Sequence, residues 1–146
     1  MSATFADSSA LVKRYVDEDG ADVVRDLGPL VVSALARVEV PAALWRKHRV
    51  GELAAGDASV LVAAFEAEWF GSAPGERRLH LVGVTPSILE DAARLTAVHG
   101  PRAYDAVQLA SVIATRVAVP EGIVFAAFDR DLRAAAATEG LGLVPG

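Results

Sequence analysis

Short apolar runs alternate along the chain with segments whose apolar positions recur every three to four residues. The runs predict strands and the recurring positions predict amphipathic helices. The predicted strands are Ala3–Ala6, Leu30–Val32, Leu79–Val84, Ile123–Phe128 and Leu141–Val144. The predicted helices are Ser8–Val16, Ala34–His48 with Ser33 as N-cap, Asp57–Phe70, Pro86–His99, a segment after Pro101 that ends near Val117, and Arg130–Thr138. This alternation predicts an α/β fold of three layers, α/β/α, with a mostly parallel central sheet.

Composition narrows the class of protein without defining its activity. The 146 residues fit one domain spanning 1–146, and a 53% apolar content without Cys predicts a conventional hydrophobic core. We expect a cytoplasmic protein that does not enter the membrane, because no signal peptide or long apolar run is recognisable. The net charge of −5 is unfavourable for a non-specific nucleic-acid coat, but clustered metal-binding carboxylates would also produce it.

Two carboxylates follow predicted strands. Asp7 comes after 3–6 and Asp129 after 123–128, and ligands of parallel sheets bind beyond the carboxyl ends of strands. Either side chain could instead cap the helix that begins next. Asp131 lies two positions further, and two helical positions rotate a side chain by about 200°. We therefore predict that Asp129, and not Asp131, belongs to the site.

Two further carboxylates fall on the apolar stripes of predicted helices. A buried charge is costly unless it is paired or metal-bound, which makes both residues candidates for a site. The alternatives are an ion pair with a distant Arg for Glu39 and a favourable helix-start position for Asp105. Glu39 shares its stripe with Leu35, Ala42 and Ala43, and Asp105 shares its stripe with Leu109, Val112 and Ile113.

The four carboxylates are predicted to converge on one pocket. Like charges cannot share a small site unless cations neutralise them or their pKa values rise. Oxygen ligands suit Mg²⁺ or Mn²⁺, and such ions can activate water and stabilise the leaving oxygen of a phosphodiester. The pattern therefore favours phosphodiester hydrolysis, with Asp7, Glu39, Asp105 and Asp129 as metal ligands and catalytic residues.

Four segments around these residues resemble the motifs of a known family. Asp7 lies in FADSSALVKRYVDE, Glu39 in SALARVEVPAALWR, Asp105 in RAYDAVQLASVIA and Asp129 in FAAFDRDLRAAAATEGL. In this order and spacing the chain resembles the PIN-domain ribonuclease family over essentially its whole length, and within it the VapC-type toxins. The resemblance implies a Mg²⁺- or Mn²⁺-dependent endoribonuclease that is the toxin of a type II toxin–antitoxin pair.

The resemblance also implies partners and a supporting residue. VapC-type toxins are typically homodimers that cleave RNA and are inhibited by a small cognate antitoxin covering the active-site groove. Ser8 matches a hydroxyl position that often supports the metal or its water, although helix capping explains it equally well. Phe128 stands where many family members have Thr or Asn, so no polar contact is expected just before Asp129.

Other interpretations remain open. The basic cluster Arg46–Arg49 and the pair Arg77–Arg78 could contact RNA phosphates or could be ordinary solvated cations. A receiver-type phospho-acceptor site is disfavoured because no Lys follows Lys47. The serious alternative is a non-catalytic PIN-like module kept for protein contacts, although retention of all four carboxylates disfavours it.

Overall fold

A parallel β-sheet forms the centre of the molecule in the computed structural model, which describes residues 3–146. The strands are β1 (Ala3–Ala6), β2 (Leu30–Ser33), β3 (Leu79–Val82), β4 (Ile123–Ala126) and β5 (Gly142–Val144). Their order in the sheet is β3-β2-β1-β4-β5, and each neighbouring pair is parallel. The prediction of a mostly parallel sheet is therefore confirmed.

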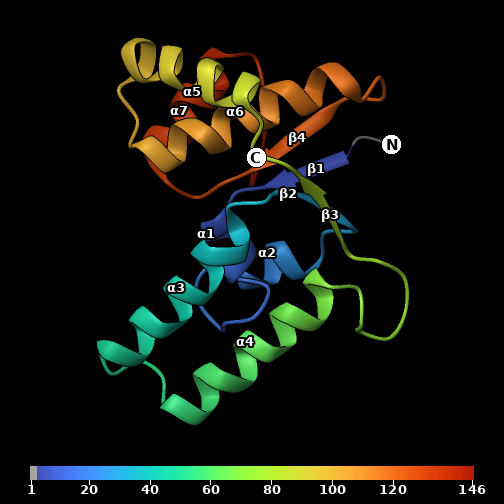
Figure 1. The fold of residues 1–146 in the computed structure, drawn as a ribbon, viewed down its shortest axis with the longest axis vertical. Helices are drawn as coiled ribbons and strands as arrows, with labels where there is room; N and C mark the ends of the chain where they lie inside the picture. Colours follow the sequence, from blue (N-terminus) through green and yellow to red (C-terminus); the bar gives the residue numbers. More distant parts are fainter. Residues whose placement is uncertain (1–2) are drawn as a thin grey trace.

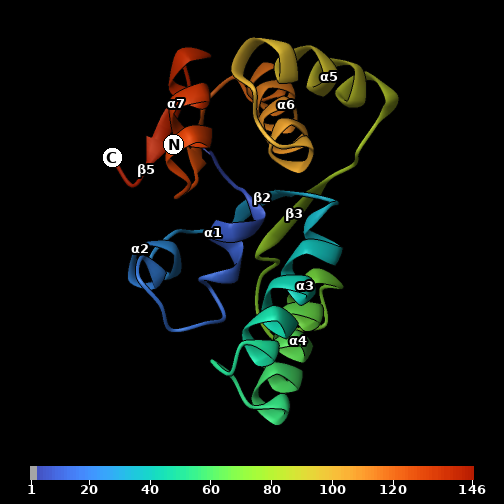
Figure 2. The same ribbon diagram turned by 90° about the vertical axis from the view of Figure 1, so that its left-hand side faces the viewer.

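Helices cover both faces of this sheet, as Figures 1 and 2 show. One layer holds α1 (Ser8–Val12), α2 (Ala21–Arg25), α3 (Ala36–Arg49) and α4 (Ala55–Trp69). The opposite layer holds α5 (Pro86–His99), α6 (Ala103–Ala118) and α7 (Arg130–Thr138). The helices α3 and α4 pack together and extend away from the sheet (Figure 1). The predicted three-layer architecture is confirmed.

Two hydrophobic cores hold the layers together. Successive side chains of a strand point to opposite faces of a sheet. Phe5 and Phe125 therefore pack beneath α5–α7, with ring centroids 6.0 Å apart, whereas Ala6 and Leu30 pack toward α1–α4. Phe65 of α4 is fully buried in the second core. Within residues 3–146, no helix has both the length and the apolar character that crossing a bilayer requires.

Several predicted boundaries were wrong. The helix predicted over Ser8–Val16 ends at Val12, and the short helix α2 was not predicted. Ser33 is the last residue of β2, paired with Val82, and its Oγ accepts a hydrogen bond from the Leu35 backbone N–H. Ser33 therefore belongs to a turn after β2 and is not the N-cap of a helix, contrary to the prediction. Because the strand continues to Ser33, α3 begins at Ala36, two residues later than predicted.

The strand predicted over Ile123–Phe128 also ends early. Its last paired residue is Ala126, because the partner ladders on β1 and β5 end there. Asp129 is consequently the third residue beyond the strand, not the first.

The strand order defines a switch point at the centre of the sheet. From β1 the chain proceeds outward through β2 and β3, then crosses to the other side of β1 to form β4. A backbone hydrogen bond from Asp7 N–H to the Ala126 carbonyl, 3.1 Å long, joins the ends of β1 and β4. In open parallel sheets, ligand sites lie outside the strand ends at such a point. The two loops that follow β1 and β4 are therefore the places to examine.

Candidate functional site: an acidic groove

A groove of about 850 Å³ lies beside these strand ends. Its lining includes Asp7, Glu39, Asp105 and Asp129, so the structure brings all four predicted carboxylates to one surface. They come from the start of α1, from α3, from the first turn of α6 and from the start of α7. Apolar side chains line part of the groove, namely Val12, Leu35, Val38, Ala42, Ala43, Tyr104 and Phe128. The remaining lining residues are polar or charged, namely Ser8, Ser9, Lys13, Glu18, Arg46, Arg102 and Gln108.

Asp7 lies directly after β1, is only 4% exposed and caps α1. Its Oδ1 accepts a 2.8 Å hydrogen bond from the Ala10 backbone N–H, and its carboxylate also accepts one from Ser9 Oγ. The capping interpretation of Asp7 is thus observed. Burial nevertheless raises the pKa of Asp7 from 3.8 to about 6, with smaller contributions from the charges of Asp105 and Glu39. The two hydrogen bonds lower this pKa but do not outweigh burial.

Glu39 projects from α3 toward the groove. The buried stripe of α3 consists of Ala36, Val40 and Leu44, one position further along the helix than the predicted stripe. The prediction that Glu39 faces the core was therefore wrong, because the predicted stripe around it lines the groove instead. No Arg pairs with Glu39 among residues 3–146. Its Oε1 accepts hydrogen bonds from Ser8 Oγ at 2.7 Å and from Gln108 Nε2 at 3.1 Å.

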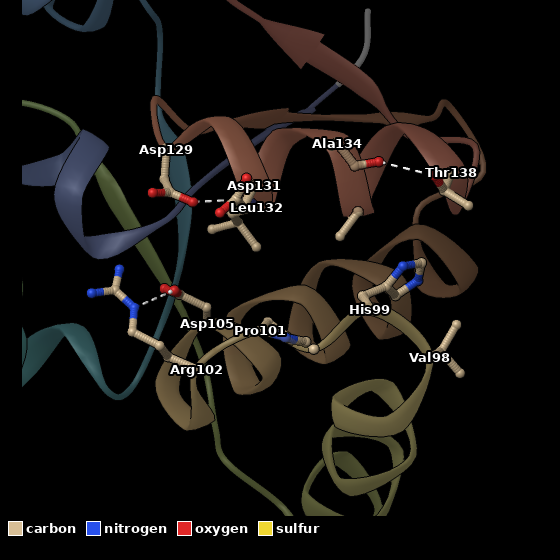
Figure 3. A pocket seen from close by; sticks show the side chains of 12 residues that line it. Val98, His99, Pro101, Arg102, Asp105, Asp129, Asp131, Leu132, Ala134 and Thr138 are labelled. Atoms are coloured by element: carbon tan, nitrogen blue, oxygen red, sulfur yellow. Dashed lines mark hydrogen bonds and ion pairs between the residues drawn. The ribbon is translucent and has the colours of Figure 1, made fainter.

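Asp105 lies opposite Asp129 across the opening between α6 and α7 (Figure 3). Arg102, the residue before α6, forms an ion pair with Asp105, with Nε 3.1 Å from Oδ2. The hydrogen bond and charge of Asp105 raise the pKa of Arg102, and the charge of Asp129 adds to this effect. Arg102 is thus a cation paired with Asp105 and close enough to Asp129 to be affected by its charge.

Asp129 caps α7, because its Oδ2 accepts a 2.9 Å hydrogen bond from the Leu132 backbone N–H (Figure 3). Asp131 is 90% exposed in its side chain, lies 3.7 Å from Arg130 Nε and does not line the acidic groove. It does border a neighbouring cleft, which Asp105 and Asp129 share. The groove therefore contains Asp129 and excludes Asp131.

The donor chemistry of the groove fits a divalent cation. Its carboxylates are hard oxygen donors of the kind that Mg²⁺ and Mn²⁺ prefer. Among residues 3–146, however, no three acidic or His side chains are close enough together to hold one ion. The four carboxylates share the groove, and their side chains would have to draw together to bind a metal.

Five polar residues that line this groove were not predicted from the sequence as part of a site, namely Ser9, Lys13, Glu18, Arg102 and Gln108. Gln108 and Arg102 both line it, and each lies three positions from Asp105 on or just before α6. Residues three apart on a helix share a face. Gln108 therefore lies on the same face of α6 as Asp105, and its polar side chain on that apolar stripe was the signal in the sequence.

The predicted basic residues are divided between the groove and other surfaces. Arg46 lines the groove, whereas Lys47 is held in ion pairs with Glu18 and Glu52. The side chain of Arg78 contacts the Leu27 carbonyl outside the groove. Of the two predicted basic sets, only the cluster on α3 contributes a residue to this surface.

Known proteins similar to this chain identify its family. Two curated relatives from Mycobacterium tuberculosis are Ribonuclease VapC45 of strain CDC 1551 / Oshkosh and Ribonuclease VapC49 of strain ATCC 25618 / H37Rv. Each is 31% identical to this chain over 149 residues, which cover 99% of this chain and 96% of the relative. No protein-family model matches the chain.

Two crystal structures share the fold. PAE2754 from Pyrobaculum aerophilum superposes with a TM-score of 0.63 at 21% identity, over 99% of this chain and 90% of its own. The sarcin-ricin loop cleaving toxin VapC20 from Mycobacterium tuberculosis superposes with a TM-score of 0.61 at 17% identity, over 91% of this chain and 95% of its own.

A parallel sheet between two layers of helices, with an acidic groove at its switch point, is the arrangement expected of a PIN-domain protein. The 31% identity to the two mycobacterial proteins extends over nearly the full length of the chain, which makes the assignment to a family specific. The chain belongs to the VapC ribonuclease family of PIN-domain proteins.

Proposed function

We propose that this protein is a Mg²⁺- or Mn²⁺-dependent endoribonuclease and the toxin of a type II toxin–antitoxin pair. The observation that carries this proposal is the convergence of Asp7, Glu39, Asp105 and Asp129, from four separate elements, on one groove at the switch point of the sheet. The relatives named as ribonucleases add independent support.

In this proposal the four carboxylates hold the divalent cation. A cation held there would supply an activated water and would stabilise charge on the phosphodiester during hydrolysis. Asp7 is fixed by the Ala10 and Ser9 hydrogen bonds, and Glu39 by those from Ser8 and Gln108. These two carboxylates are already partly ordered, which reduces the conformational freedom lost when the four side chains draw together around a cation.

RNA is the proposed substrate, entering the groove as a single strand or loop. The side chain of Arg102 is 82% exposed and Arg46 also lines the groove, so both can contact phosphates. Tyr104 is 63% exposed at the same surface, where its ring can stack on an unpaired base. This activity would take place in the cytoplasm.

The proposal is tested with purified protein freed of any partner. RNA cleavage should stop in EDTA and return when Mg²⁺ or Mn²⁺ is added in excess. Glu39→Gln and Asp105→Asn should abolish cleavage while the protein stays folded, whereas Glu90→Gln on the exposed surface of α5 should cleave normally. Full activity in EDTA would show that the metal mechanism is wrong.

A non-catalytic binding module is the second candidate. It is favoured by one observation: Asp7 and Asp129 both cap helices, so structure alone gives each a role. Mn²⁺ titration of the wild type and of Glu39→Gln separates the two candidates. A binding module should show no Mn²⁺ site that depends on Glu39.

A further inference from the structure

Gln108 is a buried amide to which the proposed chemistry has so far given no role. It lies on α6 one turn beyond Asp105 and is 2% exposed. Its Nε2 donates to Ser8 Oγ at 2.9 Å and to Glu39 Oε1 at 3.1 Å. Ser8 Oγ in turn donates to the same Glu39 oxygen at 2.7 Å. Three side chains from α1, α3 and α6 thus close a ring of hydrogen bonds.

The hydrogen bonds determine which way the amide points. An ionised carboxylate only accepts hydrogen bonds, and Ser8 has a single proton, which it donates to Glu39. Gln108 must therefore present its NH₂ group to both partners. Its Oε1 is then left buried without a hydrogen-bond partner among residues 3–146.

An unpartnered buried acceptor is costly to the fold. The neighbours of Gln108 on α6 are buried and mostly apolar, including Leu109 and Val112, so an apolar side chain would suit this position better for stability alone. The cost of the unpartnered Oε1 is offset only by the two hydrogen bonds that the NH₂ group donates, to Ser8 and Glu39. Because both partners belong to the groove, Gln108 has its role in the site and not in the core.

We propose that Gln108 is a positioning residue that orients the Glu39 carboxylate, directly and through Ser8, for binding a divalent cation. Gln108 itself need touch neither the cation nor the RNA. The inference rests on the proposed function, since it assigns Glu39 its partner in the acidic groove. Hydrogen-bonding partners of this kind orient metal ligands and tune their affinity.

The test compares Mn²⁺ binding, measured calorimetrically on the purified full-length protein, between the wild type and Gln108→Met. Met keeps the length of the side chain and removes both hydrogen-bond donors. We expect Mn²⁺ affinity to fall by about 10- to 100-fold while the metal-free melting temperature is unchanged or higher. Ser111→Ala is the matched control: it removes a buried hydroxyl on the same helix that donates only to the Val107 carbonyl, and Mn²⁺ affinity should not change.

Three further measurements separate positioning from a structural role. Gln108→Asn keeps the amide but shortens the side chain, so it should weaken Mn²⁺ binding in the same direction. Combining Ser8→Ala with Gln108→Met should cost less affinity than the product of the two single effects, because both act through Glu39. In RNA cleavage, kcat should fall while KM for RNA stays close to that of the wild type.

The possible failures are distinguishable. Wild-type protein that neither binds Mn²⁺ nor cleaves RNA would overturn the proposed function and this inference together. Wild-type protein that binds Mn²⁺ no better than both Gln108 variants would overturn this inference alone. Unfolding of both Gln108 variants, or a lower melting temperature with unchanged Mn²⁺ affinity, would assign Gln108 to the structure instead.

Discussion

Asp7 has one feature that stabilises the fold, its helix cap, and one that destabilises it, its buried charge. As an N-cap it is a stabilising residue, because it satisfies a free backbone N–H at the start of α1. As a carboxylate it is a destabilising one, because it is almost fully buried near Glu39 and Asp105. Asn caps a helix about as well as Asp, and the helix dipole favours a negative charge by only about 0.3–1 kcal/mol, which is less than the cost of burying the carboxylate. The charge therefore calls for a separate explanation, which a bound cation would provide.

This conflict predicts how Asp7→Asn changes the metal-free protein. A pKa raised from 3.8 to about 6 means that the folded state binds this proton more tightly than the unfolded chain. The resulting stabilisation is fully present below about pH 4 and is lost as the pH rises through about 6. At pH 7 the cost amounts to about 3 kcal/mol. Asp7→Asn should remove it and raise the free energy of unfolding at pH 7 by up to this amount.

The measurement is denaturant unfolding in EDTA from pH 4 to pH 8. The quantity to follow is the difference in stability between wild type and variant, because other groups titrate in the same range. Glu18 and Glu68, for example, have lowered pKa values in the folded state and lose stabilisation as the pH falls. A difference that stays constant over this range would contradict the prediction. A variant that is less stable at pH 7 would favour a purely structural role for Asp7.

At the scale of elements, helix starts supply two of the site residues. Asp7 precedes α1 and Asp129 precedes α7, and each uses one carboxylate oxygen to cap its helix. The start of a helix carries partial positive charge, which attracts anions and also steadies an acidic side chain. An Asp immediately before a helix that follows a strand thus explains both the helix cap and the position of the carboxylate near the strand ends.

The start of α7 provides a matched pair of variants. Asp129 lines the acidic groove, whereas Asp131 is exposed and lies outside it. Asp129→Asn should therefore weaken Mn²⁺ binding and abolish or strongly reduce RNA cleavage, while the cap is retained because Asn still accepts from Leu132. Asp131→Asn should change cleavage little and cost at most about 0.3–1 kcal/mol of stability from the lost helix-dipole interaction.

Cleavage assays and Mn²⁺ titration of both variants check this prediction. Loss of activity in Asp131→Asn with normal activity in Asp129→Asn would contradict the prediction that Asp129, and not Asp131, belongs to the site.

At the scale of the whole molecule, the acidic groove has an apolar surround. Val38 is 71% exposed and Tyr104 63%, and both line the groove. A partner helix that buries its apolar face here, with one basic residue directed at the carboxylates, would match both the shape and the charge of this surface. Other large apolar side chains, such as Leu81 and Leu89, are also partly exposed and could take part in self-association.

We therefore predict that the isolated protein is a homodimer and that a small antitoxin binds its groove. Sedimentation analysis at micromolar concentration should give twice the 15.2 kDa mass of the chain. Expression of the protein without its partner should arrest growth, and Glu39→Gln should relieve the arrest. A monomeric protein whose expression is harmless would count against both expectations.

The sequence alone determined the elements whose signals are local. The helix Pro86–His99 was predicted with both its ends, because Pro begins it and Gly100 ends it with a left-handed backbone at φ 65°. The parallel sheet followed from the alternation of strands and helices, and the candidate carboxylates followed from strand ends and apolar stripes. Four motifs in order were enough to identify the family.

Only the tertiary structure decided what depends on neighbours distant in sequence. Pairing with β3 extended β2 to Ser33, and the end of the ladders with β1 and β5 shortened β4 to Ala126. The face of α3 that is buried was settled by packing against α1 and α4, which turned Glu39 toward the groove and not into the core. The ring of Ser8, Glu39 and Gln108 joins residues 31 to 100 positions apart. A hydrophobic pattern reports that a face is apolar but not what covers it, and hydrogen bonds between distant side chains leave no periodic signal in the sequence.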